Sequence, residues 1–239
     1  MRAIVVAGGK GQRLWPLTES TPKAMVHVAA KPILQYHLEW LKREGVLHAI
    51  IACGHLGGVT REYLTSYPIQ GLPIVFSFEE HPLGRGGAAK KAFGALSPSD
   101  QPCIISQGDI ISDVPLREVY RAHEYSVATH GIVLTLVLAP YRSRYGVVEI
   151  EQSGLVARFR EKPRLPYWAN TGTFIASPKF FDFLPECGDE DSTIEYLVAA
   201  KKVGSFCTNF YSRTIDTPKD IQEAETDLAL ASLPHEEVF

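Results

Sequence analysis

The first half of the chain alternates short apolar runs rich in β-branched residues with amphipathic segments of helical period, and no other feature constrains the fold as strongly. This alternation is typical of an α/β protein in which helices cover the faces of a parallel sheet. Helices are expected to begin at Pro32 and Pro115, with two more near 59–67 and 88–96. The expected strands are 3–7, 49–53, 74–78, 103–107 and 132–138, the last apolar enough for a central position.

The second half of the sequence indicates antiparallel pairing. Residues 147–151 and 155–161 flank the turn-forming tripeptide Gln-Ser-Gly, which predicts a β-hairpin. Further strands are expected at 169–176 and 205–210. The expected fold is therefore an α/β domain with a mixed, mostly parallel sheet and a small antiparallel lobe.

Two helix starts stand out in this second half. Ser192 and Glu195 have the spacing of a capping box, and Thr217 with Pro218 is typical of an N-cap followed by the first helical residue. No linker, repeat or low-complexity segment interrupts the chain. We therefore expect one domain over residues 1–239, with lobes of about 1–140 and about 141–239.

Charge and composition exclude several classes of protein. A formal net charge of -3 argues against a broad surface for nucleic acid, and no apolar run approaches the length of about 20 residues that spans a bilayer. The N-terminus is expected to form a core strand and to carry no signal peptide. Widely spaced cysteines are expected as buried, reduced residues of a cytoplasmic protein: Cys53, Cys103, Cys187 and Cys207.

The loop after the first expected strand carries the strongest chemical signal. Its sequence, AGGKGQRLWPLTESTPKAM, leaves backbone N–H groups uncovered at its glycines and adds two cations, which suits a polyphosphate. It lacks the G-K-[ST] ending of a P-loop and the third glycine of the dinucleotide fingerprint. The candidate residues of this loop are Ala7, Gly8, Gly9, Gly11, Arg13 and Lys23.

With this loop the chain resembles the NDP-sugar pyrophosphorylases, the sugar-1-phosphate nucleotidyltransferases, over nearly its whole length. The resemblance implies a Rossmann-like fold of the nucleotide-diphospho-sugar transferase type. It also implies that the glycine loop wraps the phosphates of an NTP. Arg13 would stabilise the transferring phosphoryl group and the leaving pyrophosphate, and Lys23 would contact the phosphates as well.

Further motifs follow in the order of that family. The segment E-E-H-P-L-G resembles the element that lines the base pocket, which implicates Glu80, Leu83 and Gly84. The segment Q-G-D stands where the family has a G-D pair, with Gly108 beside the nucleotide and Asp109 as a metal ligand.

Three later motifs resemble the sugar-phosphate side of the family's site. Y-G-V-V places the backbone of Gly146 against the sugar, and in E-K-P the side chain of Glu161 would bond sugar hydroxyls while Lys162 grips the phosphate. In N-T-G-T-F, Asn170 and Thr171 match the sugar-facing strand.

The chemistry of such a reaction agrees with these residues. An NTP and a sugar phosphate repel each other, so cations must lie between them. Asp109 and Asp216 are hard oxygen ligands suited to Mg²⁺, which also takes waters and phosphate oxygens. The sugar phosphate can then attack the α-phosphorus in line. Positioning and charge neutralisation by Mg²⁺, Arg13, Lys23 and Lys162 replace a general base.

Substrate identity follows from finer features. The P-L-G element lacks the preceding glutamine that reads a pyrimidine, so the chain looks closest to guanylyltransferases acting on mannose- or heptose-1-phosphate. Thymidylyl, uridylyl or cytidylyl transfer to glucose-1-phosphate or a cyclitol phosphate is the alternative. Departures from the family pattern at Gln12, Gln107, Arg85 and Gly86 concern the base and the sugar. Without hexapeptide repeats, no C-terminal β-helix is expected, so a homodimer would form through the catalytic domain.

Two rival functions belong to other classes. Gly84, Gly86 and Ala89 satisfy G-x-G-x-x-[GA], the pattern of a dinucleotide-dependent oxidoreductase, although on the third strand and without the acidic residue that should follow. The other rival is a non-catalytic regulatory subunit that binds sugar nucleotides. It would be expected to lack residues such as Arg13 or Lys23, and both are present.

Overall fold

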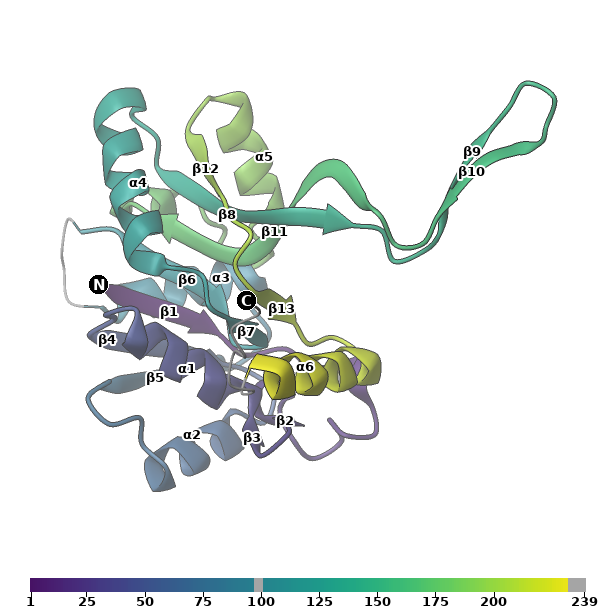
Figure 1. The fold of residues 1–239 in the computed structure, drawn as a ribbon. Coiled ribbons are helices and arrows are strands. Elements are labelled where there is room, and N and C mark those ends of the chain that lie inside the picture. The colour runs from purple at the N-terminus through teal and green to yellow at the C-terminus, as the bar shows by residue number, and fades with distance from the viewer. Residues whose placement is uncertain (97–100, 232–239) are drawn as a thin grey trace, which may run out of the picture.

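A computed structural model describes residues 1–96 and 101–231 (Figure 1). Its centre is a seven-stranded mixed sheet in the order β12-β8-β11-β6-β1-β4-β5. Strand β11 runs antiparallel to both of its neighbours, and the other pairs are parallel. The strands are β1 (Arg2–Val6), β4 (His48–Cys53), β5 (Ile74–Phe78), β6 (Cys103–Gln107), β8 (Leu134–Arg142), β11 (Arg164–Ala176) and β12 (Val203–Cys207).

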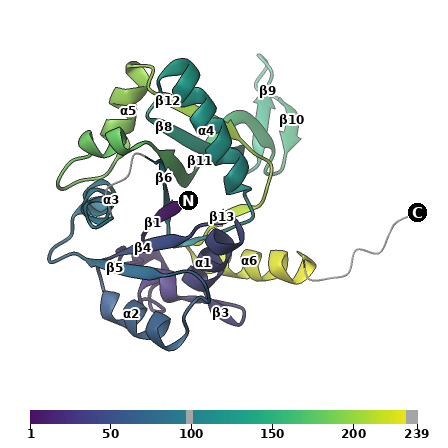
Figure 2. The ribbon, with the colours of Figure 1, turned by 90° about the vertical axis from the view of Figure 1, so that its left-hand side faces the viewer.

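Helices pack on both faces of this sheet, as the alternation along β1 requires (Figure 2). Ala3 and Val5 face a core shared with α1, α2 and α4, whereas Ile4 faces a core shared with α3 and α5. A third cluster joins α6 to the segment after β1. The helices are α1 (Ile33–Arg43), α2 (Gly57–Ser66), α3 (Gly84–Gly94), α4 (Leu116–His130), α5 (Asp191–Ala199) and α6 (Pro218–Ala231), with 3-10 turns η1 (Gln12–Leu14), η2 (Lys23–Met25) and η3 (Pro178–Asp182).

Three two-stranded sheets supplement the main sheet. They are β2–β3 (His27–Val28 with Lys31–Pro32), β7–β13 (Ile110–Ser112 with Ser212–Thr214) and β9–β10 (Val147–Ile150 with Val156–Arg160). The hairpin β9–β10 confirms the predicted antiparallel pairing. The pairs β2–β3 and β7–β13 were not predicted, because strands of two or three residues leave no periodic pattern.

A long arm leaves the body of the protein. We use this name for residues 141–168, where β8 and β11 run beyond the sheet and continue into the hairpin β9–β10 (Figure 1). At the root of the arm Arg142 pairs with Arg164, and the Ser143 amide donates to the Pro163 carbonyl at 3.0 Å, but the register of β8 and β11 shifts between Arg164 and Trp168. Figure 1 shows the arm pointing away from the body.

The mixed, mostly parallel sheet flanked by helices confirms the predicted fold class, and three local predictions are corrected. The strand predicted at 205–210 is β12, which covers Val203–Cys207. It ends there because the Thr208 hydroxyl accepts a hydrogen bond from the Phe210 amide at 3.1 Å and the chain turns away. The strand expected at 132–138 begins at Leu134 and continues to Arg142, since β11 pairs with it.

The predicted capping box is also wrong. Helix α5 begins at Asp191 with Glu190 as N-cap and no side-chain cap, so Ser192 lies inside the helix. The amide of Ile194 donates to the Glu190 carbonyl, which starts the helix before the predicted cap. Of the cysteines, Cys53 and Cys103 are buried as expected, whereas Cys187 and Cys207 are exposed. No helix in the described part of the chain is both long and apolar enough to cross a bilayer.

Candidate active site

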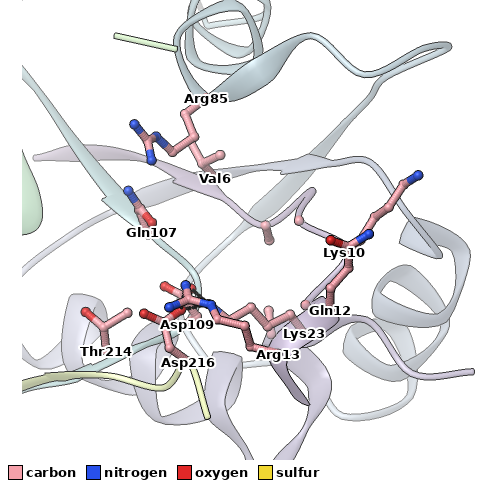
Figure 3. Close-up of a pocket in the computed structure, with 14 residues that line it drawn as sticks. Val6, Lys10, Gln12, Arg13, Lys23, Arg85, Gln107, Asp109, Thr214 and Asp216 are labelled. Carbon is pink, nitrogen blue, oxygen red and sulfur yellow. Dashed lines mark hydrogen bonds and ion pairs between the residues drawn. The ribbon is translucent and has the colours of Figure 1, made fainter. Parts of the chain in front are cut away.

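A cavity of about 520 Å³ opens at the carboxyl ends of β1 and β6, where open α/β sheets bind ligands (Figure 3). Four residues predicted to act together line it: Arg13, Lys23, Asp109 and Asp216. The remaining lining residues are Val6, Ala7, Gly9, Lys10, Gly11, Gln12, Ala24, Arg85, Gln107 and Thr214.

The glycines of the first loop have separate structural reasons. A Cβ at Gly8 would meet the Gly54 amide at 3.1 Å, so this glycine lets two loops approach closely. At Gly11 the backbone has a φ of 63°, and a Cβ would lie 2.9 Å from the Lys23 side chain. A Cβ at Gly9 would have no neighbour within 4 Å, so the backbone there is open to a ligand.

The two aspartates are brought together by the short sheet β7–β13. Thr214 pairs with Ile110, and the Ile215 amide donates to the Asp109 carbonyl at 2.9 Å. Asp216 is held from its other side, because its amide donates to Asp220 Oδ2 at 3.1 Å. A pairing between chain segments about a hundred residues apart therefore creates the acidic side of the cavity.

The ammonium group of Lys23 lies between these two carboxylates. It forms an ion pair with Asp109 Oδ2 and another with Asp216 Oδ1 at 2.6 Å. Arg13 adds a second cation, with Nη2 2.8 Å from Asp216 Oδ1. The Lys23 and Asp109 side chains are 15% and 12% exposed, whereas that of Arg13 is 65% exposed. Of Lys23 and Arg13, it is therefore Arg13 that solvent or a ligand can reach.

Burial and charge act against each other on these groups. Burial would lower the pKa of Lys23, but its ion pairs with Asp109 and Asp216 raise it. Burial raises the pKa of Asp109 despite the neighbouring ammonium group. Burial would also raise the pKa of Asp216, but Lys23, Arg13 and Arg144 lower it. The carboxylate of Asp216 thus has several cationic neighbours, and that of Asp109 depends on Lys23.

The donor set fits a divalent cation. Asp109 Oδ1 is buried and has no hydrogen-bond partner in the described part of the protein, while its other oxygen is bound to Lys23. An orphaned carboxylate oxygen beside a second carboxylate is a site at which a hard cation replaces lost hydration. Lys23 neutralises the pair from the same position. Asp109 and Asp216 are thus the residues that would hold a divalent cation here.

A second cavity of about 440 Å³ adjoins the first, sharing Val6, Gly9, Lys10 and Arg85 with it. Glu80 and Gly84, for which a base pocket was predicted, both line this cavity. Leu83 is not among its lining residues. Its backbone is the N-cap of α3, and its amide donates to Glu79 Oε2 at 2.9 Å.

The glycine pattern of the oxidoreductase rival is explained by packing. A Cβ at Gly84 would lie 2.6 Å from the Gly188 carbonyl, and one at Gly86 would lie 3.0 Å from the same oxygen. These glycines let α3 approach the segment before α5. Gly108 is also a packing residue, because a Cβ there would lie 3.1 Å from Ala7 Cβ. It is buried beside the cavity, and its amide donates to the Val6 carbonyl at 2.9 Å.

The structure does not bring the sugar-phosphate motifs of the arm into this cavity. Lys162 and Glu161 are exposed at the arm and are not among the residues that line the cavity of Arg13. The ring of Phe159 packs closely against Gly146, since a Cβ there would lie 2.6 Å from that ring. The first loop and the two aspartates therefore lie together as expected, but Lys162 does not join them.

The two predicted residues on β11 differ in placement. The Thr171 hydroxyl points into the core and donates to the Val137 carbonyl at 2.9 Å, so the expectation that it meets a sugar is corrected. Asn170 is exposed, and its Oδ1 accepts the Gly172 amide at 3.0 Å. This hydrogen bond from a backbone amide to a side chain two residues earlier holds the backbone at Gly172 in a local turn.

Two cations of the cavity were not selected from the sequence as site residues. Lys10 lies between Gly9 and Gly11, and its place inside the glycine cluster was the available signal. Arg85 reaches the cavity from α3 (Figure 3). Its guanidinium group forms ion pairs with Glu190 at 3.1 Å and Asp191 at 2.7 Å. In the sequence, Arg85 differs from the family pattern and carries no other signal of a site residue.

The comparisons with known proteins agree with this geometry. The profile of the family described as nucleotidyl transferase matches residues 2–209, so the chain belongs to that family. Its resemblance to sugar-1-phosphate nucleotidyltransferases is thereby confirmed. Members of this family generally use a divalent metal ion.

Curated relatives sharpen this assignment. A mannose-1-phosphate guanyltransferase of Debaryomyces hansenii is 32% identical over 99% of this chain and 67% of its own length. The beta-A mannose-1-phosphate guanyltransferase of Xenopus laevis is 36% identical over 76% of this chain and 51% of its own length. The chain thus spans between half and two thirds of these relatives.

A solved structure matches over nearly the whole chain. HddC from Yersinia pseudotuberculosis has a TM-score of 0.74 and 25% identity, covering 95% of this chain and 99% of HddC. HddC has also been crystallised in a complex with GMP-PN. The chain therefore shares its fold with HddC over nearly its whole length.

Proposed function

We propose that the protein transfers a guanylyl group from GTP to a mannose- or heptose-type sugar-1-phosphate, forming a GDP-sugar and pyrophosphate. One observation carries this proposal. Lys23 bridges Asp109 and Asp216 at the carboxyl edge of the sheet, directly beside an open glycine loop. That arrangement supplies both the cations and the metal ligands that two phosphate esters need.

Each residue of the cavity has a distinct part in the proposed reaction. The open backbone at Gly9 would hold the triphosphate, and exposed Arg13 would neutralise charge on the transferring phosphoryl group. Asp109 and Asp216 would hold Mg²⁺, which when bound supplies charge neutralisation to phosphate oxygens. Lys23, released from the aspartates, would contact the phosphates. The phosphate oxygen of the sugar phosphate is already an anion and needs no general base.

The two cavities suggest how the substrates divide between the lobes. Residues of about 1–140 would hold the nucleotide, with its base in the cavity lined by Glu80 and Gly84. Residues of about 141–239 would hold the sugar phosphate, with Glu161 and Lys162 as its ligands. GTP is favoured because curated guanyltransferases are more than 30% identical to this chain. A cytoplasmic location stays a prediction.

A substrate matrix tests this function. The purified chain is incubated with GTP, ATP, CTP, UTP or dTTP, each paired with mannose-, heptose- or glucose-1-phosphate and Mg²⁺, and pyrophosphate release is measured. The expected result is release with GTP and mannose- or heptose-1-phosphate, abolished by EDTA. Release only with a pyrimidine nucleotide would overturn the assigned base. Nucleotide binding without any release would favour the regulatory subunit instead.

A further inference from the structure

An arginine lies at the junction between the two cavities and is held in a defined position. The cavities share the lining residues Val6, Gly9, Lys10 and Arg85. Lys10 is exposed, whereas the Arg85 side chain is 38% exposed and forms ion pairs with Glu190 and Asp191. Glu190 is itself buried, which fixes the guanidinium group. A ligand that extends from one cavity into the other therefore meets Arg85 as an ordered group.

The guanidinium group of Arg85 has hydrogen-bond donors to spare. Its Nε donates to Glu190 at 3.1 Å and its Nη2 to Asp191 at 2.7 Å. Within the part of the chain that the structure describes, Nη1 forms no hydrogen bond, so its N–H groups can serve a ligand. The Arg85 amide donates to Asp189 Oδ1 at 2.9 Å, and the half-exposed Asp189 lines the second cavity. A donor and an acceptor thus lie together at the junction.

The charges around Arg85 select a neutral ligand group. Its guanidinium nitrogens lie 3.7 Å from Asp189, 3.1 Å from Glu190 and 2.7 Å from Asp191, so one positive charge faces three negative charges. A phosphate or carboxylate group would be repelled there. A hydroxyl group is neutral and both accepts and donates hydrogen bonds. It therefore matches the Nη1 donors of Arg85 and the carboxylate of Asp189.

The position of these two residues in the site identifies the hydroxyl group. In a nucleoside triphosphate the ribose joins the base to the α-phosphate. The cavity of Glu80 and Gly84, proposed for the base, lies on one side of the junction, and the cavity of the glycine loop lies on the other. Figure 3 shows Arg85 across the cavity from Asp109 and Asp216, away from the proposed metal ligands. The ribose therefore has to lie at the junction.

We propose that Arg85 and Asp189 bind the ribose hydroxyl groups of the nucleotide and so select ribonucleotides over nucleotides that lack these hydroxyls. Nη1 of Arg85 donates to a hydroxyl oxygen, and the carboxylate of Asp189 accepts a hydroxyl hydrogen. The ion pairs of Arg85 hold the donor in place before the nucleotide arrives, which lowers the entropic cost of binding. This inference rests on the proposed function for the placement of base and phosphates, but it does not depend on which base or which sugar is used.

Nucleotide binding without turnover tests this selection. The Kd values of GTP and of 2′,3′-dideoxy-GTP are measured by calorimetry with Mg²⁺ and without a sugar phosphate. Wild type is expected to bind GTP roughly 10- to 100-fold more tightly, the range for hydrogen bonds to a charged group. Equal Kd values would overturn the proposal. If another nucleotide binds in place of GTP, the comparison is made with that nucleotide and its dideoxy form, so a wrong base assignment is recognised separately. Binding of no nucleotide would overturn both this inference and the proposed function.

Variants distinguish a direct contact from a structural role. Arg85→Leu should bring the ratio of the two Kd values close to 1, whereas mere distortion of α3 would weaken both nucleotides alike and leave the ratio unchanged. Asp189→Ala keeps the other two ion pairs of Arg85 and should also reduce the ratio. Arg43→Leu is the matched control, because it breaks an ion pair with Asp113 and lines neither cavity, and it should keep the wild-type ratio. A wild-type ratio in both Arg85→Leu and Asp189→Ala would overturn the proposal.

Discussion

The cavity below the glycine loop and the arm both concentrate positive charge, but they hold it in opposite ways. In the cavity, Lys23 is largely buried and is fixed by two carboxylates of the same chain. In the arm, Lys162 is exposed, and Arg158 and Arg160 share Glu149. The cavity holds its cations against carboxylates of the body, whereas the arm meets the body at its root, where Arg142 and Arg144 line a cavity with Asp216.

This difference shows what each region needs before it can act. In the cavity, Lys23 already neutralises the two carboxylates. A metal ion and a nucleotide would therefore replace ion pairs that are already formed. In the arm, Lys162 is exposed to solvent, so its ammonium group becomes ordered when a substrate binds. Changes in the cavity should therefore affect every step, and changes in the arm should affect sugar-phosphate use.

The largest effect is expected for Asp109→Asn. The variant keeps the size of the side chain but removes the charge that pairs with Lys23 and the orphaned oxygen proposed to bind Mg²⁺. Turnover should fall by at least about two orders of magnitude, measured as pyrophosphate release with GTP. Asp113→Asn is the control, because Asp113 is an exposed partner of Arg43. Wild-type turnover in Asp109→Asn would remove it from the metal site.

Lys23→Met removes the ammonium group that lies between the two carboxylates. Without the ammonium group, Asp109 and Asp216 repel each other, and a divalent cation adds to the neutralisation that Arg13 and Arg144 still give Asp216. Saturating Mg²⁺ should therefore raise the Tm of this variant by about 5 °C or more, and that of the wild type less. Lys31→Met removes an ion pair with Glu39 on the body and should show no such gain. Equal shifts in all three proteins would contradict the site.

Lys162→Ala examines the arm without touching the cavity. Loss of one charge-assisted contact to a phosphate should raise the KM for the sugar-1-phosphate roughly 10- to 100-fold. The KM for GTP should stay unchanged, because the nucleotide is held by the body. Steady-state kinetics with each substrate varied in turn gives both values. Lys179→Ala, on the body in η3, is the control, and an equal rise in both KM values would show that the two regions do not divide the substrates.

The smallest effect concerns pH and the body alone. Burial lowers the pKa of His37 to about 4, and its ring contacts the Ile110 carbonyl and the Ser106 hydroxyl. Between pH 6.5 and about 4 the unfolded chain binds a proton at this residue and the folded chain does not. The free energy of unfolding should therefore fall as the pH drops through this window, by up to about 3 kcal/mol.

Urea unfolding at a series of pH values measures this loss. His37→Asn should reduce the slope between about pH 6.5 and 4, although His123, whose pKa burial also lowers to about 4, still contributes to it. His130→Asn, at an exposed position on α4, should leave the slope unchanged. The arm contains no histidine, so its hairpin should not share this dependence. A slope that is identical in His37→Asn and wild type would contradict the buried neutral imidazole.

Much of the fold could be predicted because its information is local. Strands such as β5 and β6 match the predicted bounds, since each is an apolar run ended by turn residues. Short strands such as β7 and β13 could not be predicted, because each owes its conformation to a partner about a hundred residues away. Helix α5 was misplaced because Glu190 rather than Ser192 begins it.

The sequence by itself determined the family, the glycine loop and the residue types of the site, because these depend on short motifs whose chemistry does not require distant contacts. The tertiary structure alone decided that Lys23 lies between Asp109 and Asp216, that Thr171 faces the core, and that Lys162 lies on an arm outside the cavity. Motif order says which groups a chain possesses. Only the pairing of strands and the direction of the arm fix the distances between them, and electrostatic catalysis depends on those distances.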